Sequence, residues 1–133
     1  AALAGLPAAS VMGSELHDGG QLDDPTCPRF FVALDAARGE VVLSVRGTAS
    51  LSDTISDLTG DPVPFAGGLA HMGMISGARR LREKTQDKLR YALGHLARPR
   101  LVLVGHSLGA GVAQLLAILL RGGDAECEEG AGW

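Results

Sequence analysis

The sequence has few cysteines, so it offers little material for a metal centre or a disulfide framework. Cys27 and Cys127 are the only two among 133 residues, and neither stands in the Cys-x-x-Cys or Cys/His spacing of a metal site. Two thiols and one long-range disulfide are both compatible with this pair. We therefore expect no bound metal, and the cysteines do not indicate a cellular compartment.

Basic residues and long apolar runs are scarce as well. Lys and Arg number 12 against 15 Asp and Glu, a net charge of −3, whereas a polynucleotide-binding surface needs a basic surplus. The longest apolar run, Val112–Leu120 with one Gln, is far shorter than the ~20 residues that span a bilayer. The opening segment AALAGLPAAS has no basic region before it, so it is not a complete signal peptide. We expect no nucleic-acid partner and no transmembrane segment, and the localisation stays undetermined.

The hydrophobic residues, 46% of the chain, suffice for one modest core, and their spacing alternates between strand and helix patterns. Short apolar, β-branched runs predict strands, and stripes with a 3.6-residue period predict helices. The expected order is strand, strand, helix, strand, helix, at residues 30–34, 41–45, 71–96, 101–104 and 108–121. This order is typical of an α/β protein with a mixed, mostly parallel sheet and flanking helices.

The segments between these elements refine the expectation. The turn-forming residues 35–39 predict an antiparallel hairpin of the first two strands, and the nearly all-apolar run Val41–Val45 predicts a strand buried on both faces. The prolines and glycines of TGDPVPFAGG predict a break between helices. We expect residues 1–28 to be irregular and the acidic, glycine-rich residues 122–133 to be disordered, which leaves 29–121 as the folded domain.

The strongest motif is Gly105-His106-Ser107-Leu108-Gly109, which follows an apolar strand and opens an amphipathic helix. G-x-S-x-G in this context is typical of a nucleophile elbow, in which a strained turn presents the serine hydroxyl. The glycines are needed because a side chain at either position would collide across the turn. Ser107 is therefore the candidate nucleophile, and the N–H of Leu108 at the helix start is a candidate oxyanion donor.

A second group of residues ends the strand 41–45, namely Arg46-Gly47-Thr48. If that strand runs parallel to 101–104, both carboxyl ends open on one edge of the sheet, where α/β sites lie. Thr48 is then a candidate second oxyanion donor. The alternative is that Gly47 only turns the chain and Thr48 caps the next helix.

A phosphate cradle is the competing interpretation of the glycine-rich turn. It would use the same helix N-terminus, but a P-loop needs Lys and then Ser or Thr after its last glycine, and Gly111 is followed by Val112 and Ala113. The glycines do not fit G-x-G-x-x-G either. The elbow is the better interpretation.

Three segments in this order, VLSVRGTASLSDTISDLT, AHMGM and LVLVGHSLGAGVAQLLA, resemble the class 3, fungal-lipase-like α/β-hydrolases, and most of all their sn-1-specific diacylglycerol lipase branch. The resemblance covers about 30–120 and implies a partial α/β-hydrolase domain that acts on acylglycerol esters in lipid metabolism. It implies that Ser107 is the nucleophile and that Leu108 and Thr48 form the oxyanion hole. The matching histidine of AHMGM, His71, has a structural role in this interpretation. The chemistry needs no cofactor; calcium-dependent members occur in the branch, but this sequence has no calcium-loop pattern.

The helix expected over SLSDTISDL aligns with the lid of fungal lipases. Its stripe of Leu51, Ile55 and Leu58 is suited to cover the site in water and to turn toward lipid at an interface; a helix packed permanently on the body is the alternative. The resemblance thus admits transient contact with a lipid interface and membrane association of the parent protein.

The base of a triad is missing from the sequence. In this fold it follows the serine, in the order Ser, Asp, His, whereas the histidines stand at positions 17, 71, 95 and 106. We expect the ring of His106 to point away from the Ser107 hydroxyl. The chain is therefore expected to be an inactive fragment of a lipase with an unpaired sheet edge beside 101–104. A thioesterase or phospholipase A1 on the same fold, and a non-catalytic lipid-binding or interaction module with a relic elbow, are the alternatives.

Overall fold

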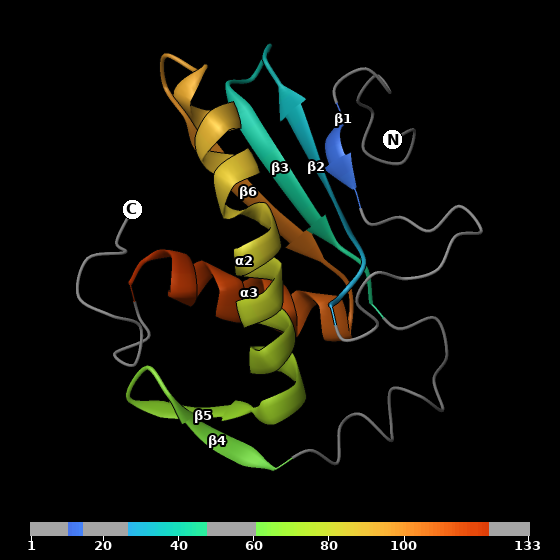
Figure 1. Ribbon diagram of the computed structural model, residues 1–133, viewed down its shortest axis with the longest axis vertical. Coiled ribbons are helices and arrows are strands. Elements are labelled where there is room, and N and C mark those ends of the chain that lie inside the picture. Colours follow the sequence, from blue (N-terminus) through green and yellow to red (C-terminus); the bar gives the residue numbers. More distant parts are fainter. Residues whose placement is uncertain (1–10, 15–26, 48–60, 123–133) are drawn as a thin grey trace.

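The computed structural model describes residues 11–14, 27–47 and 61–122, the first of these ranges as backbone only. Four strands form the main sheet, in the spatial order β1-β2-β3-β6 (Figure 1). The β1–β2 and β2–β3 pairings are antiparallel, and β3 runs parallel to β6, which meets the condition under which the carboxyl ends of these two strands open on one edge of the sheet. The strands are β1 (Val11–Ser14), β2 (Phe30–Asp35), β3 (Glu40–Val45) and β6 (Arg100–Gly105). β1 lies within the segment 1–28 that we expected to be irregular.

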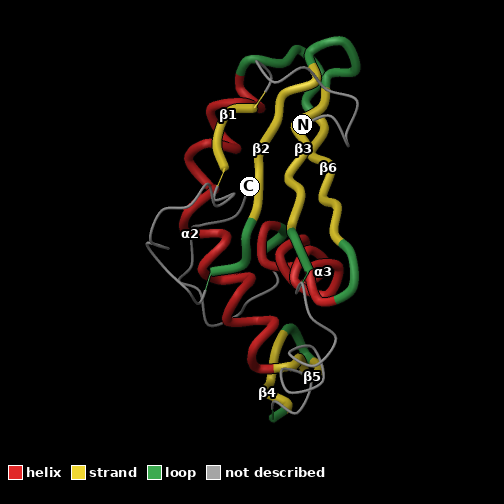
Figure 2. The backbone as a smooth tube through the Cα atoms, turned by 90° about the vertical axis from the view of Figure 1, so that its right-hand side faces the viewer, coloured by secondary structure: helices red, strands yellow, loops and turns green. Residues whose placement is uncertain are grey.

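Two helices pack against each other and against the sheet (Figures 1 and 2). They are α2 (Met72–Gly94), which crosses over between β3 and β6, and α3 (Leu108–Leu120), which follows β6 directly. Their apolar stripes and the inward side chains of β2 and β3 form one core. Its largest fully buried members include Phe30, Leu43, Ile75, Leu81, Leu89, Leu116 and Leu119. No helix in the described ranges is both long and apolar enough to cross a membrane.

The prediction that the strand 41–45 is buried on both faces is wrong. In β3, buried and half-buried side chains alternate, with Val41, Leu43 and Val45 in the core and Val42 and Ser44 on the other face. In the described part of the chain, α2 and α3 both pack on the face that carries Val41, Leu43 and Val45, and no described helix covers the other face. The valine-rich composition of β3 therefore reflects β-propensity and a central place in the sheet more than burial on both faces.

A second, two-stranded sheet lies where the sequence predicted only a break between helices. β4 (Pro62–Phe65) and β5 (Gly68–His71) pair antiparallel, with Phe65 opposite Gly68. The two residues of the turn both have positive φ, 49° at Ala66 and 78° at Gly67, as a tight primed hairpin turn requires. The hairpin leads directly into α2 and so fixes where that helix begins.

The outer strand β6 is less covered than β2 and β3. Leu101, Val102 and Leu103 are half-buried and Val104 is exposed, because β3 is the only strand that pairs with β6 in the described part of the chain. The expected short helix at 50–58 and most of the expected tail lie outside the described residues.

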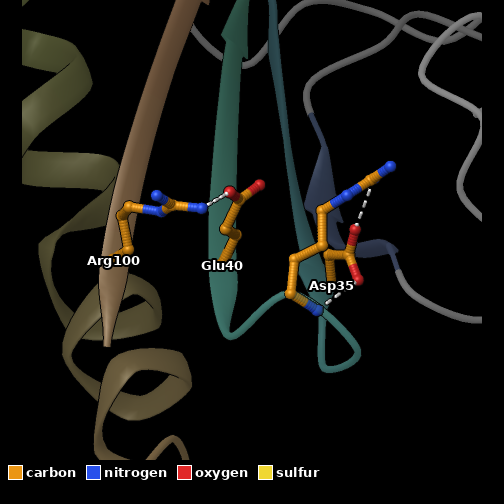
Figure 3. Close-up of polar contacts among 4 residues, drawn as sticks. Asp35, Glu40 and Arg100 are labelled. Carbon is orange, nitrogen blue, oxygen red and sulfur yellow. Dashed lines mark hydrogen bonds and ion pairs between the residues drawn. The ribbon is translucent and has the colours of Figure 1, made fainter. Parts of the chain in front are cut away.

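Ion pairs hold the end of the sheet at which β3 and β6 begin (Figure 3). Arg100 of β6 pairs with Glu40, its register partner on β3. Asp35, nearly buried at the end of β2, accepts hydrogen bonds from the backbone N–H and the guanidinium of Arg38, at 3.1 and 3.0 Å. These contacts close the β2–β3 hairpin and leave the opposite end of β3 and β6 open for the site.

Candidate active site

Ser107 lies in the turn between the end of β6 and the start of α3, at the carboxyl end of the parallel strands. Its backbone has φ 55° and ψ −126°, and its side chain caps no N–H group of the helix. A positive φ costs a residue with a Cβ about 1–3 kcal/mol, and such a conformation persists only where the surrounding structure enforces it. The residue is exposed, so the turn presents the serine at the surface.

Close backbone packing on both sides of Ser107 enforces this conformation. A Cβ on Gly105 would lie well inside 3.0 Å of the backbone of Gly109 and Ala110. A Cβ on Gly109 would lie 2.6 Å from the carbonyl oxygen of Val45. Neither position has room for a side chain, so both motif glycines are required, as the sequence predicted. The absence of a side chain at Gly109 also lets the start of α3 pack directly against the end of β3.

Gly47 has a role in the site that the sequence left undecided. A Cβ there would overlap the carbonyl oxygen of His106 and lie 3.6 Å from the Cβ of Ser107. Because Val45 and Gly105 are register partners, the residues that follow them run side by side. Gly47 thus does more than turn the chain: it lets the end of β3 touch the elbow. The Arg-Gly pair directly after a central strand is the sequence signal for this contact.

The first turn of α3 points its N–H groups toward the elbow. The N–H groups of Ala110 and Gly111 donate to the Ser107 carbonyl at 2.9 and 3.3 Å, and that of Gly109 donates to the His106 carbonyl at 3.0 Å. Leu108 is the first residue of the helix, and an N–H at this position has no partner inside the helix. A free N–H at the start of a helix is what the predicted oxyanion role of Leu108 requires.

Met74 is a support of the site that the sequence did not reveal. Its sulfur packs where a Cβ on Gly111 would stand, 2.6 Å from the Met74 Sδ, so the first turn of α2 braces the first turn of α3. The position of Met74 is fixed in turn by His71, whose Nδ1 accepts a hydrogen bond from the Met74 N–H at 3.4 Å and caps α2. The structural role expected for His71 is confirmed. A glycine one turn after a G-x-S-x-G serine is the only signal the sequence carries for this contact.

Two further histidines of the sequence are described, His106 in the elbow and His95 at the end of α2. His106 is exposed. His95 lies at the far end of α2, where its Nδ1 is 2.7 Å from the Tyr91 carbonyl oxygen. Thr48 and the lid residues Leu51, Ile55 and Leu58 lie outside the described residues. Within the described ranges, no three His, Cys, Asp or Glu side chains are grouped so that they could hold a metal ion.

The thiol of Cys27 is buried, with its sulfur 3.6 Å from the Pro28 carbonyl oxygen. The adjacent Pro28 ring lies against α2, because a Cβ on Gly77 would be 3.0 Å from its Cγ. Cys27 therefore contributes to packing near the start of β2. Cys127, the other cysteine, lies outside the described residues.

A strained serine between a parallel strand and a helix, with glycines at each close approach, defines an α/β-hydrolase-type protein. The comparison with family models gives the family. Residues 42–128 match the model of "Lipase (class 3)". The chain belongs to this family.

Relatives and a solved structure agree with this assignment. Human diacylglycerol lipase-alpha is 43% identical over 105 residues, 69% of this chain and 10% of that protein. The secreted mono- and diacylglycerol lipase A of Penicillium cyclopium is 36% identical over 95 residues, 69% of this chain and 31% of that one. The structure of Rhizomucor miehei triacylglyceride lipase superposes with a TM-score of 0.72 at 19% identity, over 85% of this chain and 42% of that one. The chain thus spans a third or less of these two relatives, and the distant structure supports the fold alone.

Proposed function

We propose that this chain is part of a serine ester hydrolase that acts on acylglycerols, with Ser107 as its nucleophile. The observation that carries the proposal is the backbone of Ser107, held at φ 55° between β6 and α3. Membership of the class 3 lipase family supports it, as do the names of its relatives, which are lipases of diacylglycerols and monoacylglycerols.

The proposed reaction proceeds through an acyl-enzyme. The Ser107 oxygen attacks the ester carbonyl carbon while a base takes the hydroxyl proton, and the carbonyl oxygen becomes an oxyanion. The N–H groups of Leu108 and Thr48 are the proposed donors to that oxyanion. Its collapse breaks the ester bond and releases the alcohol, which takes up the proton. Water then attacks the acyl-enzyme and releases the fatty acid.

The base and its orienting acid belong, in this proposal, to a part of the parent protein outside these 133 residues. Three histidines are described: His71 caps the start of α2, His95 ends that helix, and His106 precedes Ser107 in the turn. We further propose that Leu51, Ile55 and Leu58 form an apolar cover over the site that turns toward a lipid surface. Residues 29–121 form the hydrolase part in this proposal.

A hydrolysis assay on diacylglycerol and on a short-chain ester tests the proposal. The parent protein that contains this chain is expected to hydrolyse both, and Ser107→Ala is expected to abolish the activity. Ser76→Ala, which changes an exposed serine of α2, is the matched control and should leave it unchanged. The 133-residue chain alone is expected to show no turnover above background. Full activity in the Ser107→Ala parent would overturn the proposal.

The second candidate is a non-catalytic lipid-binding or interaction module. The sequence left this alternative open beside the hydrolase. It predicts that lipid vesicles bind the parent protein with equal affinity before and after Ser107→Ala, and that neither form releases fatty acid. A substrate series that includes thioesters and phospholipids separates the acylglycerol proposal from a thioesterase or a phospholipase A1.

A further inference from the structure

The first turns of α2 and α3 meet where one side chain packs against one stretch of backbone. Met74 of α2 is half-buried, and its Sδ, Cε and Cγ lie 2.6, 3.3 and 3.8 Å from the point where a Cβ on Gly111 of α3 would stand. Non-bonded atoms in contact are normally about 3.5–4.0 Å apart, so the thioether fills the place of the missing side chain. Figure 1 shows the crossing of the two helices that allows this approach.

Gly111 is unfavourable in a helix unless this contact requires it, because glycine is a poorer helix residue than alanine. The next contact between the two helices is looser. A Cβ on Gly77 of α2 would lie 3.7 Å from the Cγ2 of Val112, an ordinary van der Waals distance. The tight contact at this crossing is therefore that of the Met74 sulfur on Gly111.

The backbone of Gly111 is hydrogen-bonded to the candidate nucleophile. Its N–H donates to the Ser107 carbonyl at 3.3 Å, beside the 2.9 Å bond from the Ala110 N–H. Ser107 has φ 55°, a conformation that persists only where the surrounding structure enforces it. On the side of β3 the packing partner is backbone, against Gly109, whereas on the side of α2 it is the side chain of Met74. A substitution at Met74 therefore loosens the turn without altering the serine or the motif glycines.

The position of Met74 is fixed by the residues before it. Its N–H donates to the Nδ1 of His71 at 3.4 Å, and His71 caps α2. The imidazole ring lies against Gly73, where a Cβ would be 3.3 Å from its Cε1. Since β5 ends at His71, the hairpin and the helix cap together place the sulfur over α3.

We propose that Met74 is a positioning residue of the elbow. Its sulfur, packed against the Gly111 backbone, holds the first turn of α3, and with it the Ser107 carbonyl and the N–H of Leu108, in the arrangement that ester hydrolysis uses. Met74 itself takes no proton and forms no bond in the reaction. The inference rests on the proposed function, because it gives Met74 a part in that reaction through Ser107.

Kinetics of the parent protein on a short-chain and a long-chain glycerol ester test the proposal. A misplacement of about 1 Å costs a reaction up to about 100-fold in rate. For the loss of one support among several, we expect Met74→Ala to lower kcat about tenfold and to change KM by less than about twofold, equally on both substrates. Met74→Leu conserves the volume of the side chain and should recover most of the rate.

Two control variants separate positioning from a general effect on the fold. Met72→Ala removes a methionine from the same turn, one that is 46% exposed, and should leave kcat unchanged. Leu81→Ala removes a fully buried side chain from the same helix. It should lower the stability of the protein but leave the kcat of the folded fraction unchanged.

Gly111→Ala tests the contact from the side of α3. Its added methyl would displace the Met74 sulfur, so we expect kcat to fall. In the double variant with Met74→Ala, the methyl enters the space that the thioether has left, and the two losses should not multiply. Losses that multiply as independent effects do would overturn the proposed contact.

Amide hydrogen exchange provides a measurement that needs no activity. In the parent protein, the exchange of the peptide that holds Ala110 and Gly111, followed by mass spectrometry, should become faster in Met74→Ala and stay the same in Met72→Ala. Unchanged exchange, or unchanged kcat, in the Met74→Ala variant of a parent that Ser107→Ala inactivates would overturn the inference and leave the proposed function standing.

Two further outcomes would contradict the positioning role. A loss of rate that grows with the length of the acyl chain would overturn it, because Met74 would then act by contact with the substrate. Full activity of the Ser107→Ala parent would overturn the proposed function and, with it, the part of Met74 in hydrolysis.

Discussion

Gly109→Ala should destabilise the protein, although alanine is the better helix residue. In the interior of a helix, alanine is favoured over glycine by about 1 kcal/mol. At this position, however, the added methyl would lie 2.6, 2.8 and 2.9 Å from the Val45 oxygen, the Arg46 carbonyl carbon and the Gly47 nitrogen. All three atoms belong to the backbone at the end of β3, so no side chain can rotate to relieve the overlap.

The magnitude follows from these two opposing effects. Overpacking of a tight site costs about 1–3 kcal/mol, and a rigid backbone neighbour places this case at the upper end. After the gain of about 1 kcal/mol in helix propensity is subtracted, a net loss of about 2 kcal/mol in the free energy of unfolding is expected. Gly94→Ala is the matched control, because Gly94 ends α2 with no atom within 4 Å of an added Cβ. It should stabilise the protein by about 0.5–1 kcal/mol.

Equilibrium unfolding in urea, followed by circular dichroism at 222 nm, measures both differences. The two glycine-to-alanine changes are expected to move the midpoint in opposite directions. If Gly109→Ala matched or exceeded Gly94→Ala in stability, the start of α3 would not press on the end of β3. The close packing that we use to explain the positive φ of Ser107 would then be wrong as well.

Three further changes test the supports around the site by the same unfolding assay. His71→Ala removes the acceptor for the Met74 N–H and should cost about 1 kcal/mol, whereas His71→Asn should restore most of it. Leu81→Ala leaves a cavity at a side chain with no exposure and should cost about 2–5 kcal/mol; a smaller loss would mean that the core around α2 is loosely packed. Glu40→Gln breaks the ion pair with Arg100, whose side chain is 66% exposed, and should change stability by less than about 1 kcal/mol, with a smaller effect at high salt. A larger effect would show that this pair fixes the register of β3 and β6.

The spacing of apolar residues correctly predicted the helices and strands whose apolar side chains form the core. The α2 stripe of Ala78, Leu81 and Leu89 is fully buried, and the expected helix at 71–96 is found at Met72–Gly94. The hairpin β4–β5 was missed because Pro62 and Pro64 argue against a strand and because its turn uses Ala66 at positive φ. Alanine is uncommon at such a position, so the local sequence gives no turn signal there.

The candidate site was predictable in its motif but not in its supports. The need for glycine at positions 105 and 109 could be predicted, because the five-residue G-x-S-x-G pattern is visible in the sequence itself. Gly47 and Met74 touch the elbow only because the sheet register and the crossing of α2 over α3 bring distant segments together. Contacts of this kind depend on tertiary packing, which no local pattern encodes. Thr48 as the second oxyanion donor, and the lid, stay predictions.

The parallel pairing of β3 with β6 has a consequence for the order of folding. The β2–β3 hairpin closes over a few residues, whereas Glu40 meets Arg100 across 60 positions of the chain. Closing so long a loop carries a larger entropic cost and a slower rate than forming the hairpin or the α2 helix. Gly47 reaches His106 only in that late step. A partly folded chain in which β3 and β6 are not yet paired therefore lacks the backbone contact that helps to hold Ser107 at positive φ.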